Sequence, residues 1–225
     1  MNGDQKRLSI LGSTGSVGTQ TLEVVRSHPD QFNVVCLGAN RNTNVLKKQI
    51  LEFLPKAISC DYHKELSDRI NFTQTLMSLE QIATHEEIDT VVVATSGNVA
   101  LIPTFEAIKS GKDIAIANKE TIIMAGEQLT NLAKSNSVNL MPVDSEPSAI
   151  WQCLRGENKD ISKLIITASG GPFRNIPISS LSSVTPTDAL RHPTWEMGTK
   201  ISVDSATMMN KAFEVIEAKW LFDVP

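Results

Sequence analysis

The segment Gly12–Gly18, with the sequence GSTGSVG, constrains the fold more strongly than any other part of the chain. It follows the apolar run Leu8–Leu11 and leads into Ser16–Arg26, which has the apolar spacing of a helix. Glycines let the backbone turn tightly and approach a pyrophosphate closely, and the free amide groups at a helix start hold the anion. We therefore predict a βαβ unit that binds a dinucleotide; a plain strand-to-helix turn is the alternative.

Strand-like and helix-like segments alternate along the rest of the chain. Two further predicted strands, Thr90–Ala94 and Ile114–Ala117, lack polar alternation, as strands buried on both faces do. This alternation predicts the α/β class, with a Rossmann-type and mostly parallel sheet. The other predicted strands are Phe32–Leu37, Leu140–Val143 and Leu164–Thr167, and the predicted helices are Asn44–Leu54, Ile102–Ser110, Ile122–Lys134 and Ala206 to about Leu221.

The composition changes after about Asp144. The segment Gly170–Trp195 is rich in Gly, Pro, Ser and Thr and is longer than an ordinary connection. Long segments of this kind are usually lids, binding loops or disordered regions. We therefore predict a dinucleotide-binding domain over residues 1–144 and an α+β catalytic domain with a lid loop over residues 145–225.

Charge and cysteine content exclude several classes of protein. The net charge of −4 argues against general binding to nucleic acid or to anionic membranes. No run approaches the roughly 18 apolar residues of a membrane span, and no signal-peptide core precedes Leu8, so we expect a cytoplasmic protein. Cys36, Cys60 and Cys153 lie far apart without a C-x-x-C pair, so we expect reduced thiols rather than disulfides or a zinc site.

The residues after two predicted strands indicate the cofactor. The stretch Leu37–Asn42 has no carboxylate, the group that NAD-binding folds usually place there for the ribose hydroxyls. Arg41 can contact a 2′-phosphate instead, so we predict NADPH; a solvated surface arginine is the alternative. Asn118, Lys119 and Glu120 follow a later strand, at the edge of the sheet where ligands bind, although Asn118 can equally be a helix cap.

Two carboxylates follow the predicted strand Leu140–Val143. If the backbone is extended there, the side chains of Asp144 and Glu146 share a face. They can then bind one hard cation, Mg²⁺ or Mn²⁺, through oxygen, but the D-x-E pattern is also common in solvated turns.

Polar residues of the last predicted helix strengthen that interpretation. Its apolar stripe, formed by Met209, Phe213, Ile216 and Trp220, is expected to be core. Off the stripe lie Ser205, Asn210, Lys211 and Glu214, where the i,i+4 and i,i+3 spacings let the last three converge. Together they suit a phosphate and a metal, with an ordinary surface Lys–Glu pair as the alternative. Ser169, just before Gly170, adds a hydroxyl and free amides.

Six stretches, in order, resemble the 1-deoxy-D-xylulose 5-phosphate reductoisomerase family: GSTGSVG, ANKE, VDSE, SGGPF, RHPTWEMG and ISVDSATMMNKAFEVIEAKWLF. The resemblance implies NADPH and a divalent metal, Mg²⁺ or Mn²⁺, with Co²⁺ as a further candidate. It implies rearrangement and reduction of 1-deoxy-D-xylulose 5-phosphate to 2-C-methyl-D-erythritol 4-phosphate in non-mevalonate isoprenoid precursor biosynthesis. It also implies a homodimer.

The resemblance also implies roles for individual residues. Cofactor contacts fall on Thr14, Gly15, Ser16, Val17, Asn40, Arg41, Asn42, Asn118, Glu120 and Gly198. Metal ligands fall on Asp144, Glu146 and Glu214, which with Lys119 form the catalytic set. Substrate contacts fall on Lys119, Ser145, Glu146, Ser169, His192, Ser205, Asn210, Lys211 and Glu214, and Trp195 lies in the loop that covers the site.

The chain departs from the family at two positions and in length. Asn40 stands where glycine is expected, and Pro147 stands where many members have histidine. The family continues beyond the point reached by Pro225, so we expect the catalytic domain to be incomplete.

Two other classes of protein compete with this interpretation. One is a semialdehyde- or imine-type NADP reductase, for which Cys153 is the only candidate nucleophile beyond the cofactor half. The other is a non-catalytic NADPH-binding module.

Overall fold

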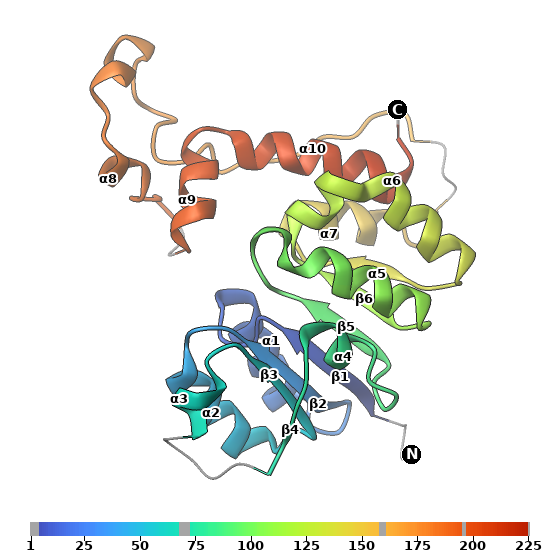
Figure 1. The fold of residues 1–225 in the computed structure, drawn as a ribbon. Helices are drawn as coiled ribbons and strands as arrows, with labels where there is room; N and C mark the ends of the chain where they lie inside the picture. Colours follow the sequence, from blue (N-terminus) through green and yellow to red (C-terminus); the bar gives the residue numbers. More distant parts are fainter. Residues whose placement is uncertain (1–4, 68–72, 158–160, 195–196, 225) are drawn as a thin grey trace. The chain divides into compact units, whose positions relative to one another are not determined.

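The computed structural model describes residues 5–67, 73–157, 161–194 and 197–224 (Figure 1). The chain divides into two compact units, Met1–Asp144 and Ser145–Pro225. Each unit is described by itself.

In the described part of the first unit, seven strands form one parallel sheet in the order β4-β3-β2-β1-β5-β6-β7. The strands are β1 (Lys6–Leu11), β2 (Phe32–Ala39), β3 (Ala57–Cys60), β4 (Thr75–Leu76), β5 (Thr90–Val93), β6 (Asp113–Ile116) and β7 (Leu140–Pro142). The predicted α/β class with a parallel sheet is therefore confirmed.

Helices connect these strands. They are α1 (Ser16–Ser27), α2 (Thr43–Phe53), α3 (His63–Ser67), α4 (Leu79–Ala83), α5 (Leu101–Lys109) and α6 (Lys119–Ser135), with a 3₁₀ turn, η1, over Gly97–Ala100. From β1 the chain proceeds through β2 and β3 in one direction and later through β5 and β6 in the other (Figure 1). Right-handed crossovers therefore put α1 and α2 on one face of the sheet and α5 on the other. The strand order reverses between β1 and β5, the point where such folds bind ligands.

The sheet is buried on both faces. All four residues of β3 and all four of β5 are buried, and Ile10 and Leu11 of β1 are fully buried. Leu22 of α1 and Leu46 of α2 pack into the same core as Ile10. Continuous apolar runs thus become central strands, as the sequence predicts.

The stretch between Leu54 and Thr90 contains elements that the hydrophobic pattern does not predict. Strands β3 and β4 are only four and two residues long, too short to show a period. Helix α4 has only five residues, but Ser78 and Gln81 form a capping box at its start. That pair is a local signal from which α4 could have been found.

The second unit contains helices and loops in its described residues. The helices are α7 (Ser145–Cys153), the 3₁₀ helix η2 (Ile178–Ser183), α8 (Pro186–Ala189), α9 (Thr199–Ala206) and α10 (Met209–Phe222). The prediction of a strand at Leu164–Thr167 is wrong, because these residues have no regular structure. A strand needs a neighbouring strand for its hydrogen bonds, and the described residues of this unit contain none.

The predicted last helix, Ala206 to about Leu221, is observed as α10, which begins three residues later, at Met209. Met208 adopts a left-handed conformation with φ of 61° and separates α9 from α10. The prediction that Met209, Phe213, Ile216 and Trp220 are core is also wrong: Met209 is exposed and the other three are half-buried.

Acidic residues occupy the buried face of α10 instead. Glu214 and Glu217 are 1% and 2% exposed, and Ala218 is buried beside them. Apolar spacing therefore fails to identify this face, because the face that packs inward carries a charged network.

The longest helix, α6, has 17 residues and contains non-helical backbone at Ala125. None of the helices in the described ranges has both the length and the apolar content that crossing a membrane would require.

One ion pair joins the beginnings of β1 and β5. The backbone N–H and the Nε of Arg7 donate to Asp89 Oδ2 at 2.9 and 3.0 Å, and Asp89 N–H donates to the Arg7 carbonyl at 2.8 Å. The pKa of Asp89 is lowered from 3.8 to about 2, and the largest cause is the hydrogen bond from the Arg7 guanidinium. The pair thus fixes the register of the two strands at the centre of the sheet.

We expect Asp89→Asn to lower the free energy of unfolding by about 1 kcal/mol at pH 7, since both side chains are partly exposed to screening solvent. Because the folded-state pKa is depressed, this stabilisation is present above about pH 4 and is lost as the pH falls towards 2. In thermal denaturation across this range, the difference in Tm between the unmodified protein and Asp89→Asn should shrink as the pH falls. A difference that stays constant would contradict the stabilising role given to the Arg7–Asp89 pair. Glu106→Gln, which breaks an exposed pair with Lys109, is the control and should change Tm little.

Candidate functional site

The glycine loop joins β1 to α1 through close backbone contacts. Gly12 has φ of +90°, and a Cβ there would lie 2.7 Å from the Ala94 carbonyl carbon. A Cβ on Gly18 would lie 2.2 Å from the Gly12 oxygen. Both positions therefore require glycine. Gly15 is the N-cap of α1, and no side chain caps the helix, so its first N–H groups can serve an anion.

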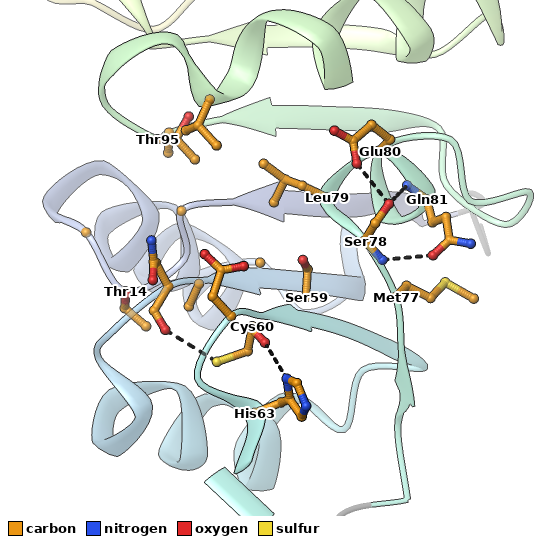
Figure 2. Close-up of a pocket in the computed structure, with 18 of the residues that line it drawn as sticks. Thr14, Ser59, Cys60, His63, Met77, Ser78, Leu79, Glu80, Gln81 and Thr95 are labelled. Carbon is orange, nitrogen blue, oxygen red and sulfur yellow. Dashed lines mark hydrogen bonds between the residues drawn. The ribbon is translucent and has the colours of Figure 1, made fainter. Parts of the chain in front are cut away.

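A pocket of about 840 Å³ opens beside this loop at the carboxyl ends of the strands (Figure 2). Its volume is within the range of small-molecule and cofactor sites. It is lined by Gly12, Thr14, Gly15, Gly38, Ala39, Asn40, Ser59, Cys60, Asp61, His63, Leu76, Met77, Ser78, Leu79, Glu80, Gln81, Ala94, Thr95, Ser96 and Val99.

Among the predicted cofactor residues, Thr14, Gly15 and Asn40 line this pocket. Ser16 and Val17 begin α1 next to it. Asn40 is exposed and is absent from the residues with positive φ, so asparagine replaces the expected glycine without strain.

Arg41 and Asn42 follow directly, at the start of α2. Both residues are exposed. Asn42 is the N-cap of α2, where its side chain accepts from Val45 N–H at 3.3 Å. Arg41 thus stands in a short exposed loop between the pocket-lining Asn40 and a capped helix.

Asn118 has the structural role that the sequence left as an alternative. The residue is 1% exposed, and its Oδ1 accepts from Thr121 N–H at 2.7 Å, capping α6. Its Nδ2 donates to the carbonyls of Thr95 and Gly97 at 2.8 and 3.0 Å. Asn118 therefore fixes the loop after β5, while Glu120 lies half-buried in the first turn of α6.

Much of the pocket wall was missed by sequence reasoning. Ser59–Asp61 lie at the end of β3, and Met77–Gln81 lead into α4 and form its first turn. Neither stretch forms part of a recognised motif. Figure 2 shows Cys60 and His63 across the pocket from Thr95. The Thr95 hydroxyl is buried without a hydrogen-bond partner among the described residues. The pocket therefore has one buried polar group that its own protein does not satisfy.

Lys119 and Asp144, both predicted site residues, form an ion pair within the first unit. Lys119 is 6% exposed although it carries an ammonium group. A buried ammonium requires a compensating charge, which the carboxylate of Asp144 supplies.

In the second unit, Lys211 links two predicted carboxylates. Its Nζ donates to Glu146 Oε1 at 2.8 Å and forms a second ion pair with Glu214. Asn210 Nδ2 donates to the other oxygen of Glu214 at 2.6 Å, and Ser145 Oγ donates to Glu146 at 2.6 Å. The predicted convergence of Asn210, Lys211 and Glu214 is therefore observed.

The charges of this network stabilise one another. Burial pushes the pKa of Glu146 upward, but hydrogen bonds from Lys211 and Ser145 outweigh it and leave the pKa below its usual value. Burial lowers the pKa of Lys211, but the two carboxylates outweigh that effect and raise it. Glu146 and Lys211 are thus held in their charged forms.

The backbone around Glu146 is helical, not extended as the sequence analysis supposed. Glu146 lies in the first turn of α7, so the expected sharing of a face by alternate extended residues does not apply. The helix start nevertheless favours a carboxylate through its dipole. Pro147 is buried in the same turn, where proline needs no hydrogen-bond donor.

Two further predicted substrate residues contact each other in the second unit. Ser169 Oγ and His192 Nε2 are 3.0 Å apart. Gly171 has φ of +66°, and a Cβ there would lie 2.6 Å from the Ser205 carbonyl oxygen. Glycine therefore lets the Ser169 loop lie directly against the end of α9, next to Ser205.

One predicted cofactor residue, Gly198, remains apart from this network. Gly198 is the exposed N-cap of α9, and nothing lies within 4 Å of a Cβ built there. Trp195 lies outside the described residues.

Comparison with known proteins gives the same family for both units. A model described as 1-deoxy-D-xylulose 5-phosphate reductoisomerase matches residues 8–126, and one described as the C-terminal domain of that enzyme matches residues 140–222. The reductoisomerase of Geobacter metallireducens is 50% identical, over 98% of this chain and 60% of the relative. That of Caldanaerobacter subterraneus subsp. tengcongensis is 52% identical, over 98% and 59%. The chain thus spans about 60% of the length of these curated relatives.

Solved structures agree with these matches. A DOX-P reductoisomerase in complex with NADPH, fosmidomycin and magnesium has a TM-score of 0.91 at 38% identity, over 97% of this chain and 59% of that chain. The Zymomonas mobilis 1-deoxy-D-xylulose 5-phosphate reductoisomerase in complex with NADPH has a TM-score of 0.87 at 35% identity, over 99% and 59%. Since the first family model alone matches more than half of its residues, the chain belongs to the 1-deoxy-D-xylulose 5-phosphate reductoisomerase family.

Proposed function

We propose that this chain catalyses the NADPH- and metal-dependent rearrangement and reduction of 1-deoxy-D-xylulose 5-phosphate to 2-C-methyl-D-erythritol 4-phosphate. The observation that carries the proposal is the Glu146–Lys211–Glu214 network, at positions where family resemblance implies metal and substrate contacts. In this role residues 1–144 bind the cofactor, and residues 145–225 bind substrate and metal. The reaction belongs to non-mevalonate isoprenoid precursor biosynthesis.

NADPH suits the pocket beside the glycine loop. The amide groups at the start of α1 and the side chain of Thr14 would hold the pyrophosphate. The exposed Arg41 would pair with the 2′-phosphate. The unpaired Thr95 hydroxyl supports a polar ligand in this pocket. Asn118 and Glu120 would form the nicotinamide side, Asn118 through the loop it fixes, and Gly198 would make a further cofactor contact.

The carboxylates suit a magnesium or manganese ion. Hard divalent cations prefer carboxylate oxygen, which Asp144, Glu146 and Glu214 provide. Glu146 and Glu214 already share the positive charge of Lys211, so this locus accommodates a cation. When bound, such an ion polarises the substrate oxygens and stabilises charge that develops on them.

The remaining polar residues would orient the substrate. Ser205, Asn210 and Lys211 would anchor its phosphate away from the reacting carbons, which fixes the substrate's orientation. Lys119, Ser145, Ser169 and His192 would contact the rest of the molecule. Closure of the Gly170–Trp195 segment would exclude water from the reactive intermediate.

We further propose that the protein is a cytoplasmic homodimer. Cys36 and Cys60 are buried unpaired thiols, which is typical of a reducing compartment. The dimer is proposed from family resemblance alone.

The first test is a turnover assay on the protein at its natural length. NADPH oxidation should depend on 1-deoxy-D-xylulose 5-phosphate and on added Mg²⁺ or Mn²⁺, and it should stop when the metal is chelated. Omission of the substrate is the control. Absence of metal-dependent turnover would overturn the assignment.

The second test is Glu214→Gln, which removes the carboxylate charge but keeps the size of the side chain. Turnover should fall by about 100-fold or more, whereas the Kd for NADPH should hardly change. Glu217→Gln is the matched control, since Glu217 is equally buried on the same helix. It should retain turnover. A large loss of NADPH affinity in Glu214→Gln would contradict the role given to Glu214.

The third test is Arg41→Asp, which replaces the proposed 2′-phosphate partner with a group that suits the ribose hydroxyls of NADH. The ratio of kcat/KM values for NADPH and NADH should shift towards NADH. Lys48→Asp, the same charge change at an exposed position within α2, should leave the ratio unaltered. An unchanged ratio in Arg41→Asp would mean that Arg41 is only a surface residue.

A further inference from the structure

A buried glutamine of α2, Gln49, is hydrogen-bonded to the glycine loop. Ser13 is 0% exposed and Gln49 is 4% exposed. The Ser13 hydroxyl donates to Gln49 Oε1 at 2.8 Å, and Gln49 Nε2 donates back to the Ser13 carbonyl at 2.8 Å. Two reciprocal hydrogen bonds therefore join the loop to a helix 36 residues further along the chain.

The orientation of the Gln49 carboxamide is fixed by this chemistry. The Ser13 carbonyl can only accept, so Nε2 must face it and Oε1 must face the hydroxyl. Leu46 and Ile50, the neighbours of Gln49 on the buried side of α2, are apolar. A buried carboxamide is unfavourable unless it is paired, and an apolar side chain would suit this position without any partner. Gln49 therefore contributes the orientation of its two hydrogen bonds to Ser13 rather than added burial energy.

Helix α2 connects two parts of the proposed cofactor site. It begins at the Asn42 cap, beside Asn40 and Arg41. Gln49 comes about two turns later and reaches Ser13, the residue directly before the pocket-lining Thr14. On the sheet side, the N–H groups of Gly12 and Ser13 both donate to the Gly38 carbonyl, at 2.9 and 2.8 Å.

We propose that Gln49 is a positioning residue that holds the Gly12–Gly18 loop in the conformation that binds the cofactor pyrophosphate. This inference rests on the proposed binding of NADPH. A loop that is already fixed loses less conformational entropy when it binds its ligand. Gln49 then strengthens binding of the pyrophosphate without touching the cofactor.

The test compares two ligands that share one end. NADPH carries the pyrophosphate, whereas adenosine 2′-monophosphate has the adenine, ribose and 2′-phosphate but no pyrophosphate. In Gln49→Met, which keeps the size of the side chain but removes both hydrogen bonds, the Kd for NADPH should rise about tenfold. The Kd for adenosine 2′-monophosphate should stay within about twofold of the unmodified protein. Both can be measured by titration calorimetry well below Tm.

Ser13→Ala provides a second variant that keeps Gln49 in place. It removes one of the two hydrogen bonds, so the Kd for NADPH should rise by about threefold. This variant carries the test if Gln49→Met fails to fold.

Ile50→Val is the matched control, because it weakens the buried side of α2 without touching the loop. It should lower Tm but leave both Kd values unaltered. The role of Gln49 is overturned if Gln49→Met leaves the Kd for NADPH unchanged, or if it weakens both ligands equally. If the unmodified protein binds no NADPH, the proposed function itself is overturned, and this role with it.

Discussion

The backbone contact between the glycine loop and the end of β5 is the constraint on which the first unit depends. With any side chain at Gly12 the loop could not lie against Ala94, and with one at Gly18 helix α1 could not start where it does. This contact lies where the strand order reverses, so it fixes the pocket and the first turn of α1 together. Asn118 then holds the neighbouring loop from the other side. The glycine loop and the loop after β5, which both line the pocket, are thus fixed by backbone contacts and by the Asn118 side chain.

The second unit follows a different principle. Three of its predicted site residues are joined by ion pairs rather than by backbone contact, with Lys211 between Glu146 and Glu214. The burial of Glu214 and the exposure of Met209 follow from this network, because α10 turns its charged face inward. Such an arrangement stores little hydrophobic stabilisation but fixes the directions of several polar groups.

The sequence predicted the parts of the fold that have a strong period or a specific motif. The glycine loop, the central strands and the convergence of Lys211 with Glu214 were all expected, since each depends on local spacing. Predictions failed where the outcome depends on distant partners. Leu164–Thr167 has strand composition, but the described residues of its unit offer no strand to pair with. The face of α10 that is buried depends on the ion pair between Lys211 and Glu146, which lies in another helix. Gln49 was missed because one glutamine in a helix carries no signal until Ser13 is seen beside it.

The position of Lys211 has a consequence for the order of assembly. Two carboxylates brought together would repel each other, and small metalloproteins often stay unfolded until the metal arrives to neutralise its ligands. Here the ammonium of Lys211 already supplies that charge to Glu146 and Glu214 from within the chain. Under the proposed function, Glu146 and Glu214 would therefore need no metal to offset their charges during folding, and the ion would bind afterwards to groups that are already in place.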